Sequence, residues 1–259
     1  LMISLWSYHF SQFFELTFFG GKMKTIVSDL DGTLLNKESK VASYTKNILN
    51  TSHVNKIIAT GRSYKTVLPL FEDVSIDYYV LLNGAECRDN QGNILYKENI
   101  SSTTASNIMK HLLENSIDFE VNTEQEDYST DTAFCPASKP LLEDQIHTLK
   151  EIRKIFIFLE DKEKIKSIKE WLNGIENIYV TSSSWWNIEI TSSHANKALM
   201  VERVLTLIQV PKEETYVCGD GYNDMTLFKK FTHTRAMENG VPELKRIAEK
   251  VIESNENHG

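Results

Sequence analysis

The feature that most limits the possible folds is a repeated pattern, in which a short apolar run ends in a polar or glycine-containing turn. It occurs in residues 25–28 before Asp29, 56–59 before Thr60, 78–82 before Asn83, and 215–218 before Gly219. Such runs are typical of strands buried on both faces of a parallel sheet. Helical patterns lie between or beside them, in residues 44–50, 64–71, 197–207 and 225–230. The alternation predicts a doubly wound α/β fold that binds its ligand at the carboxyl ends of the strands.

The middle of the chain has a different organisation. Strand-like segments (119–122, 154–159, 177–181) alternate there with helical ones (103–115, 139–149, 162–172), and turn glycines are nearly absent. This region also carries most of the net charge of -8. We therefore expect residues 84–188 to form an α+β domain inserted into a core made of residues 23–83 and 189–259.

The first 22 residues do not continue either pattern. They are rich in aromatic side chains and contain only two charged residues, Glu15 and Lys22. A basic segment that would suit a secretory signal is missing. Met23 directly precedes the first strand-like run. We expect Met23 to be the natural start and residues 1–22 to be upstream sequence.

Charge and cysteine content exclude several classes of protein. An acidic chain without a run of Lys or Arg is a poor binder of nucleic acid or of an anionic membrane surface. No stretch reaches the roughly 18 apolar residues that a membrane span requires. Cys87, Cys135 and Cys218 are far apart and form no Cys-x-x-Cys pair, which predicts a reduced, cytoplasmic compartment. The sequence carries no signal for an oligomeric state.

Carboxylates follow the first and the last of the four apolar runs. Asp29 and Asp31 follow one, and Asp220 and Asp224 follow the other. A buried carboxylate costs several kcal/mol unless a cation offsets its charge. Converging carboxylate oxygens with few other donors suit Mg²⁺. The alternative for any one of these residues is the capping of a helix or turn.

Thr60 and Lys197 are candidates for holding a phosphate. Thr60 places a hydroxyl beside backbone amides at a strand-to-helix turn, which favours anion binding. Lys197 opens a helix, and its charge would offset both the carboxylates and a phosphoryl group. The alternative for Lys197 is a solvated helix residue.

Four segments in order resemble the signatures of the haloacid dehalogenase-like hydrolases, in the Cof-type branch. They are Asp29-Leu30-Asp31-Gly32-Thr33-Leu34-Leu35, Ala59-Thr60-Gly61-Arg62, Lys197, and Gly219-Asp220-Gly221-Tyr222-Asn223-Asp224. The resemblance covers residues 23–259, and it implies a Rossmann-like core with a cap that selects the substrate. One departure is Ala198, where the family usually has glycine.

The resemblance also implies roles for individual residues. Asp29 would be the nucleophile and Asp31 the general acid and base, with Thr60 and Lys197 completing the catalytic set. Mg²⁺ would be held by Asp29, the backbone carbonyl of Asp31, Asp220 and, directly or through water, Asp224. The predicted substrate contacts are the Leu30 amide, Thr60, Gly61, Arg62, Asn83, Lys197 and Asn223.

These roles predict a Mg²⁺-dependent phosphatase that acts on a small phosphorylated metabolite through an aspartyl-phosphate. A sugar phosphate is the first candidate substrate, and a phosphorylated cofactor such as pyridoxal phosphate or flavin mononucleotide is the next. Two alternatives stay open. A phosphosugar mutase would use the same nucleophile, and a binding or regulatory protein would keep the fold without catalysis.

Two features of the inserted region have more than one interpretation. Trp185 and Trp186 are expected to pack near the hinge, and stacking on a substrate is the alternative. The acidic side chains of this region are expected to form a solvated face, although they could also bind a cationic group or repel anions. They are Glu120, Glu124, Glu126, Asp127 and Asp131.

Overall fold

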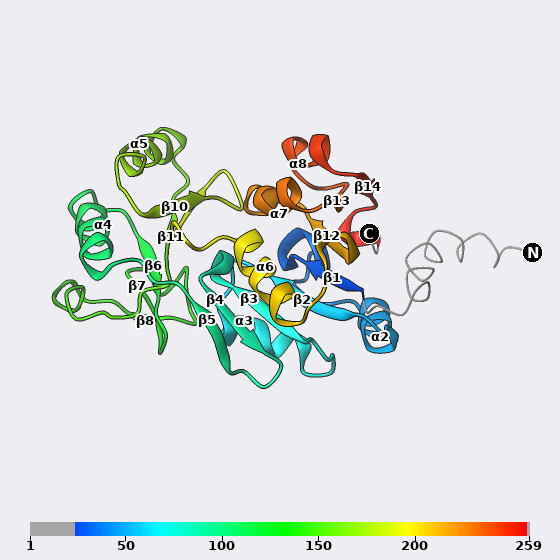
Figure 1. Ribbon diagram of the computed structural model, residues 1–259. Coiled ribbons are helices and arrows are strands. Elements are labelled where there is room, and N and C mark those ends of the chain that lie inside the picture. Colours follow the sequence, from blue (N-terminus) through cyan, green and yellow to red (C-terminus); the bar gives the residue numbers. More distant parts are fainter. Residues whose placement is uncertain (1–23, 258–259) are drawn as a thin grey trace, which may run out of the picture.

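The computed structural model describes residues 24–257 and divides them between two β-sheets that lie side by side (Figure 1). The expectation about residues 1–22 lies outside the described residues. The larger sheet has eight strands in the order β14-β13-β12-β1-β2-β3-β4-β5, and the smaller has six in the order β10-β11-β9-β6-β7-β8. No helix within residues 24–257 combines the length and the hydrophobicity needed to cross a membrane.

Six strands of the larger sheet are parallel. They are β1 (Thr25–Ser28), β2 (Asn55–Ala59), β3 (Tyr78–Leu81), β12 (Thr215–Gly219), β13 (His233–Met237) and β14 (Lys250–Ile252). Strand β1 pairs with β2 on one side and with β12 on the other, so the strand order changes direction beside β1. Ligands of doubly wound sheets bind at the carboxyl ends of the strands at such a switch point.

Helices cover both faces of the larger sheet because successive strand residues point to opposite sides. Ile57 and Ala59 of β2 pack with α6 (Lys197–Leu207), α7 (Met225–Lys230) and α8 (Pro242–Ile247). Ile58, on the opposite face, packs with Leu49 of α2 (Ser43–Thr51) and with Val67 of α3 (Tyr64–Val67). The predicted doubly wound α/β fold is confirmed.

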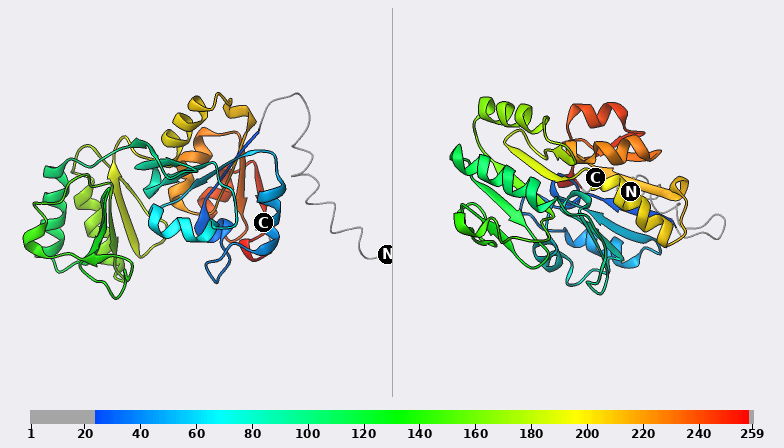
Figure 2. Two further views of the ribbon diagram at one scale, coloured as in Figure 1. Left: turned by 90° about the horizontal axis from the view of Figure 1, so that it is seen from below. Right: turned by 60° about the vertical axis from the view of Figure 1, so that its left-hand side comes forward.

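The smaller sheet has one apolar and one polar face. Its strands are β6 (Phe119–Asn122), β7 (Asp127–Ser129), β8 (Lys139–Pro140), β9 (Lys154–Phe158), β10 (Ile178–Thr181) and β11 (Asn187–Ser192). Helices α4 (Ser102–Glu114) and α5 (Lys162–Leu172) pack against Val121, Ile155 and Ile188. Figure 2 shows these helices on the side of the sheet that is turned away from the larger sheet. The alternate, polar strand residues therefore face the larger sheet.

The chain passes from one sheet to the other at positions that differ from the predicted domain boundaries, 84 and 188. Strands β4 (Glu86–Asp89) and β5 (Ile94–Lys97) return from β3 and pair antiparallel in the larger sheet. Strand β11 lies wholly in the smaller sheet and ends at Ser192. At Leu82–Gly84 the chain reverses its direction but stays in the larger sheet, because β4 pairs antiparallel with β3.

The helix predicted over residues 139–149 is wrong. Lys139–Pro140 pairs with β7 instead, and the amide of Leu141 donates to the carbonyl oxygen of Ser129 at 2.8 Å. Only Glu143–Gln145 forms a short 3₁₀ turn. A backbone whose donors and acceptors are engaged in strand pairing has none left for a helix.

Candidate active site

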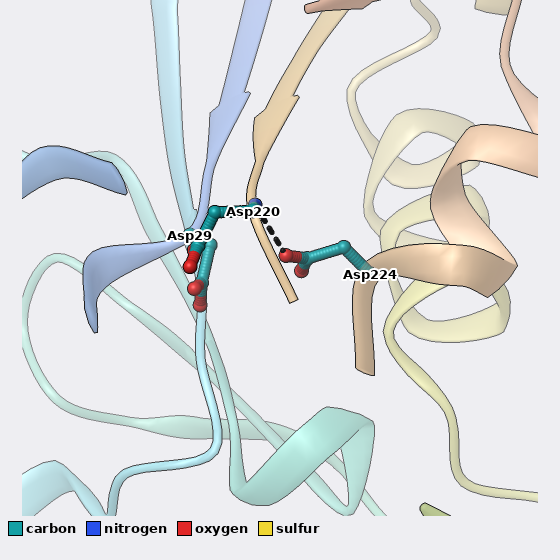
Figure 3. Close-up of side chains that lie close together, drawn as sticks. All are labelled: Asp29, Asp220 and Asp224. Carbon is teal, nitrogen blue, oxygen red and sulfur yellow. Dashed lines mark hydrogen bonds between the residues drawn. The ribbon is translucent and has the colours of Figure 1, made fainter. Parts of the chain in front are cut away.

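Three aspartates meet at the carboxyl ends of β1 and β12. Asp29 directly follows β1, and its amide donates to the carbonyl oxygen of Cys218 in β12 at 3.1 Å. Asp220 directly follows β12, and Asp224 ends the short turn beyond it. Each of the three offers a carboxylate oxygen that lies within 4.8 Å of the other two (Figure 3). The pairing of β1 with β12 thus brings together groups from opposite ends of the chain.

Lys197 of α6 (Lys197–Leu207) contacts this cluster. It is the first residue of α6, whose start is fixed by Asn196, because the Asn196 side chain accepts from the amide of Leu199 at 2.9 Å. The Lys197 ammonium donates to Asp29 Oδ1 at 2.8 Å and to Asp224 Oδ1 at 2.7 Å. Lys197 is only 1% exposed, so a solvated helix residue is the wrong description of it.

The cluster is electrostatically unbalanced. Burial raises the pKa of Asp29 well above its usual range, and Asp224 and Asp220 add to the rise while Lys197 opposes it. Burial and then the charge of Asp224 raise the pKa of Asp220 to about 6. Burial lowers the pKa of Lys197, but Asp224 and Asp29 outweigh that effect and raise it. With one lysine against three carboxylates, two negative charges remain when all three acids are ionised. A hard divalent cation with oxygen ligands fits this donor set, and Mg²⁺ is such an ion.

The turn after β1 packs closely against Asp220. Gly32 has φ of 76°, and a Cβ atom there would lie 2.2 Å from Asp220 Oδ2. Thr33 donates its hydroxyl hydrogen to Asp220 Oδ1 at 2.8 Å. Glycine is required here both for the left-handed backbone and for the close approach.

Asp31 lies outside the carboxylate cluster. Its two carboxylate oxygens accept from Arg62 Nε at 2.8 Å and from Arg62 Nη2 at 2.5 Å. The Asp31 side chain is 54% exposed, whereas that of Asp29 is buried. The geometry therefore distinguishes the two aspartates of the first signature: one belongs to the cluster and the other faces the open site. The metal contact of the Asp31 carbonyl stays a prediction.

The second signature and two asparagines form a connected layer beside the cluster. The Thr60 hydroxyl oxygen accepts from the amide of Arg62 at 3.2 Å, and the amide of Asn83 donates to the carbonyl oxygen of Thr60 at 2.9 Å. The Asn83 side chain donates to Glu189 at 2.7 Å and accepts from Asn223 at 3.3 Å. Asn83 therefore supports Thr60 and Asn223 and is itself engaged with Glu189.

A cavity of about 580 Å³ separates the two sheets at this point. Its wall on the larger sheet includes Asp29, Asp31, Thr60, Gly61, Arg62, Asp220 and Asn223. Leu30, Asn83, Lys197 and Asp224 do not line it. The Leu30 side chain is fully buried in the apolar cluster under α2 and α3, which leaves only its backbone for a substrate contact. A cavity of this size suits a small molecule.

The wall on the smaller sheet holds residues that the sequence did not single out. The Lys154 ammonium donates to the Gly61 carbonyl oxygen at 2.5 Å and lies 3.3 Å from Glu189 Oε2. Both side chains are nearly buried, at 5% and 3% exposure. The available signal was a single charge within an otherwise apolar strand, since a buried charge requires a partner.

Some of the aromatic and acidic side chains that the sequence singled out in the inserted region line the cavity, and others do not. Trp186 lines the cavity and packs edge-to-face on Phe156, with ring centroids 6.3 Å apart, whereas Trp185 is 52% exposed. Glu120 and Asp127 line the cavity, and Asp127 is only 7% exposed. A solvated face is therefore the wrong description of Asp127.

Comparisons with known proteins agree with this geometry. A sequence profile of haloacid dehalogenase-like hydrolases matches residues 26–259. Phosphatase YwpJ of Bacillus subtilis is 26% identical, with 92% of this chain and 97% of that protein covered. The B. subtilis 5-amino-6-(5-phospho-D-ribitylamino)uracil phosphatase YwtE is 27% identical, with 92% and 95% covered. A solved haloacid dehalogenase-like hydrolase from B. subtilis superposes with a TM-score of 0.81 at 25% identity, with 92% and 97% covered. The chain belongs to the haloacid dehalogenase-like hydrolases, as its four signatures predict.

Proposed function

We propose that this protein hydrolyses the phosphoric monoester of a small metabolite, with a sugar phosphate as the first candidate, and that Asp29 is the nucleophile. The observation that carries the proposal is the position of Asp29 beside Lys197 and the carboxylates of Asp220 and Asp224, at the edge of the cavity. Two relatives that bear the name phosphatase support this reaction class. We further propose that the part with the larger sheet is the catalytic core and that the part with the smaller sheet is a substrate-selecting cap.

In the first step an Asp29 oxygen forms a bond to phosphorus while the bond from phosphorus to the leaving oxygen breaks. Asp31 gives a proton to that leaving oxygen. In the second step Asp31 takes a proton from a water molecule, which attacks phosphorus, and the Asp29 carboxylate is released. Arg62 holds Asp31 at the cavity through two hydrogen bonds, and one of them must open before an Asp31 oxygen can carry the proton. Lys197 orients Asp29 through its hydrogen bond and favours the ionised form of that carboxylate against the effect of burial.

Asp29, Asp220 and Asp224 are the residues that would hold Mg²⁺, together with the carbonyl of Asp31. The ion supplies a positive charge that offsets the charge on the phosphoryl oxygens. Thr60 and the backbone of Gly61 lie on the same wall and would bind the remaining phosphoryl oxygens. The polar face of the smaller sheet covers the site and limits the access of water.

Hydrolysis of p-nitrophenyl phosphate in the presence of Mg²⁺ tests the proposal. We expect activity that is lost with EDTA and in Asp29→Asn, and retained in the matched variant Asp144→Asn, whose side chain is exposed. Undiminished activity in Asp29→Asn would contradict the nucleophile. With a sugar phosphate, release of inorganic phosphate supports a phosphatase, whereas formation of an isomer supports a mutase.

A further inference from the structure

The strand register of the smaller sheet places a compact polar group on the cavity wall. Asn122 of β6 lies directly beside Asp127 of β7 and, on its other side, beside Lys154 of β9. Glu120, two residues before Asn122 and on the same face, lies beside Phe156. Neighbours across a ladder have their Cβ atoms about 5 Å apart. All five side chains line the cavity, so they face the same ligand space.

The positive charges of the cavity wall are already engaged. Arg62 is paired with Asp31, and Lys154 with the Gly61 carbonyl and Glu189. Within residues 24–257, no Lys, Arg or His nitrogen lies within 4.0 Å of the carboxylates of Glu120 or Asp127.

Hydroxyl groups are the partners of these two carboxylates. Ser138 donates to Glu120 Oε1 at 2.5 Å, and Ser63 donates to Asp127 Oδ2 at 2.9 Å. A neutral hydroxyl satisfies one oxygen but leaves the charge of the carboxylate in place. Among residues 24–257, the carboxylates of Glu120 and Asp127 on the wall of the cavity therefore have no ion-pair partner within 4.0 Å.

Asn122 provides an independent observation at the same place. It is only 2% exposed, and its amide nitrogen is directed to Glu120 Oε2 at 3.4 Å. Its carbonyl oxygen Oδ1 is buried and has no hydrogen-bond partner among the described residues. A buried acceptor without a donor is costly and is uncommon in a finished protein interior. Asn122 thus lacks a donor that residues 24–257 could supply.

Building on the proposed phosphatase function, we propose that Glu120, Asp127 and Asn122 form a subsite for a protonated amine on the leaving group of the substrate. An ammonium group supplies both the missing donor hydrogens and the missing positive charge. A hydroxyl would supply a donor but no charge, and a second phosphate would be repelled. The preferred substrate is therefore a zwitterionic amino phosphate.

Binding of matched ligand pairs tests this subsite separately from catalysis. Hydrolysis of p-nitrophenyl phosphate by the unmodified protein first establishes whether the proposed phosphatase function holds. Calorimetry with Mg²⁺ then measures Kd on Asp29→Asn, which leaves the ligand intact. The pairs are glucosamine 6-phosphate with glucose 6-phosphate, and 2-aminoethyl phosphate with 2-hydroxyethyl phosphate.

We expect the amino member of at least one pair to bind about tenfold or more tightly than its hydroxyl partner. Adding Glu120→Gln, or Asp127→Asn as a second variant, should remove most of that difference. Glu114→Gln makes the same change on an exposed residue of α4, on the far side of the sheet, and should preserve it. Equal affinities within both pairs, no binding of either pair, or a preference that survives Glu120→Gln and Asp127→Asn in folded protein would overturn the subsite.

Discussion

At the scale of single residues, Lys197 supplies positive charge inside the acidic cluster. It is the ammonium that bridges Asp29 and Asp224, and all three side chains are almost completely buried. Removing one partner of a buried ion pair leaves an uncompensated charge, which costs more than the pair itself contributes. The same lysine therefore serves both the stability of the fold and the proposed chemistry.

Lys197→Met should lower the free energy of unfolding of the metal-free protein by about 3–5 kcal/mol. The loss should shrink towards acidic pH, where the aspartates take up protons. Urea denaturation at two pH values measures both effects. Lys110→Met, on the exposed side of α4, is the control and should change stability by no more than about 0.5 kcal/mol. A loss as small as that of the control would show that Lys197 is not needed to balance the cluster.

Asp31→Asn should lower kcat by about 100-fold to 10,000-fold, because the variant cannot transfer a proton. The Kd for Mg²⁺ should change little, since the Asp31 side chain lies outside the carboxylate cluster and points to Arg62. Steady-state kinetics and a Mg²⁺ titration distinguish the two effects. Parallel losses of turnover and Mg²⁺ affinity would argue against the acid and base role.

The raised pKa of Asp220, about 6, gives a pH dependence to both stability and metal binding. Folded Asp220 holds its proton more tightly than an unfolded aspartate, whose pKa is near 3.8, so metal-free stability should fall as pH rises between these values. Mg²⁺ needs the ionised carboxylates, and it should raise Tm more at about pH 8 than at about pH 5. Thermal melts with Mg²⁺ and with EDTA check this, and equal increments at both pH values would contradict it.

At the scale of elements, the sequence predicts best what local periodicity determines. Helices α5, α6 and α7 have the bounds expected from their apolar spacing, and β1 and β6 match their apolar runs. The region after Lys139 was missed because its pairing with β7 is a tertiary contact that no local pattern records. Motif order likewise predicted that Asp29 and Asp220 approach each other, whereas the Glu189–Asn83 hydrogen bond depends on how the two sheets face one another.

Gly32→Ala should reduce activity by roughly tenfold or more, because a methyl group would displace Asp220. The positive φ should add a loss of stability of about 1–3 kcal/mol. Gly174→Ala is a matched control, since a Cβ there makes only ordinary contact, 3.4 Å from the Trp171 oxygen. Turnover of p-nitrophenyl phosphate and thermal melts of both variants measure the effects. Wild-type turnover in Gly32→Ala would show that the turn tolerates a side chain.

At the scale of the whole molecule, buried and part-buried polar contacts join the two sheets across the cavity. Lys154 reaches Gly61, Glu189 accepts from Asn83, and Ser63 donates to Asp127. The residues that connect the two sheets therefore also line the cavity or support its wall. Sequence patterns could not reveal these contacts, because each connects a strand residue of the smaller sheet with a turn beside a strand of the larger sheet.

Lys154→Met should raise KM, because Gly61 loses the donor to its carbonyl oxygen and Glu189 loses its counter-charge. The two parts should separate more easily, so limited proteolysis between them should be faster. Lys166→Met, exposed on α5, makes the same change without either contact. Unchanged KM and unchanged cleavage rates in Lys154→Met would show that the lysine does not hold the sheets together.

The central position of β1 in the larger sheet has a consequence for synthesis of the protein. Its partner β12 is translated late: Thr33 and Asp220, which share a hydrogen bond, are 187 positions apart in the sequence. Until then one edge of β1 has unpaired backbone groups, which invite pairing with other chains. A polypeptide still on the ribosome without β12 contains Asp29, the proposed nucleophile, but not yet Asp220 and Asp224. The proposed phosphate cleavage therefore cannot begin before Asp220 and Asp224 have been translated, and a chaperone that shields this edge should improve the yield of active protein.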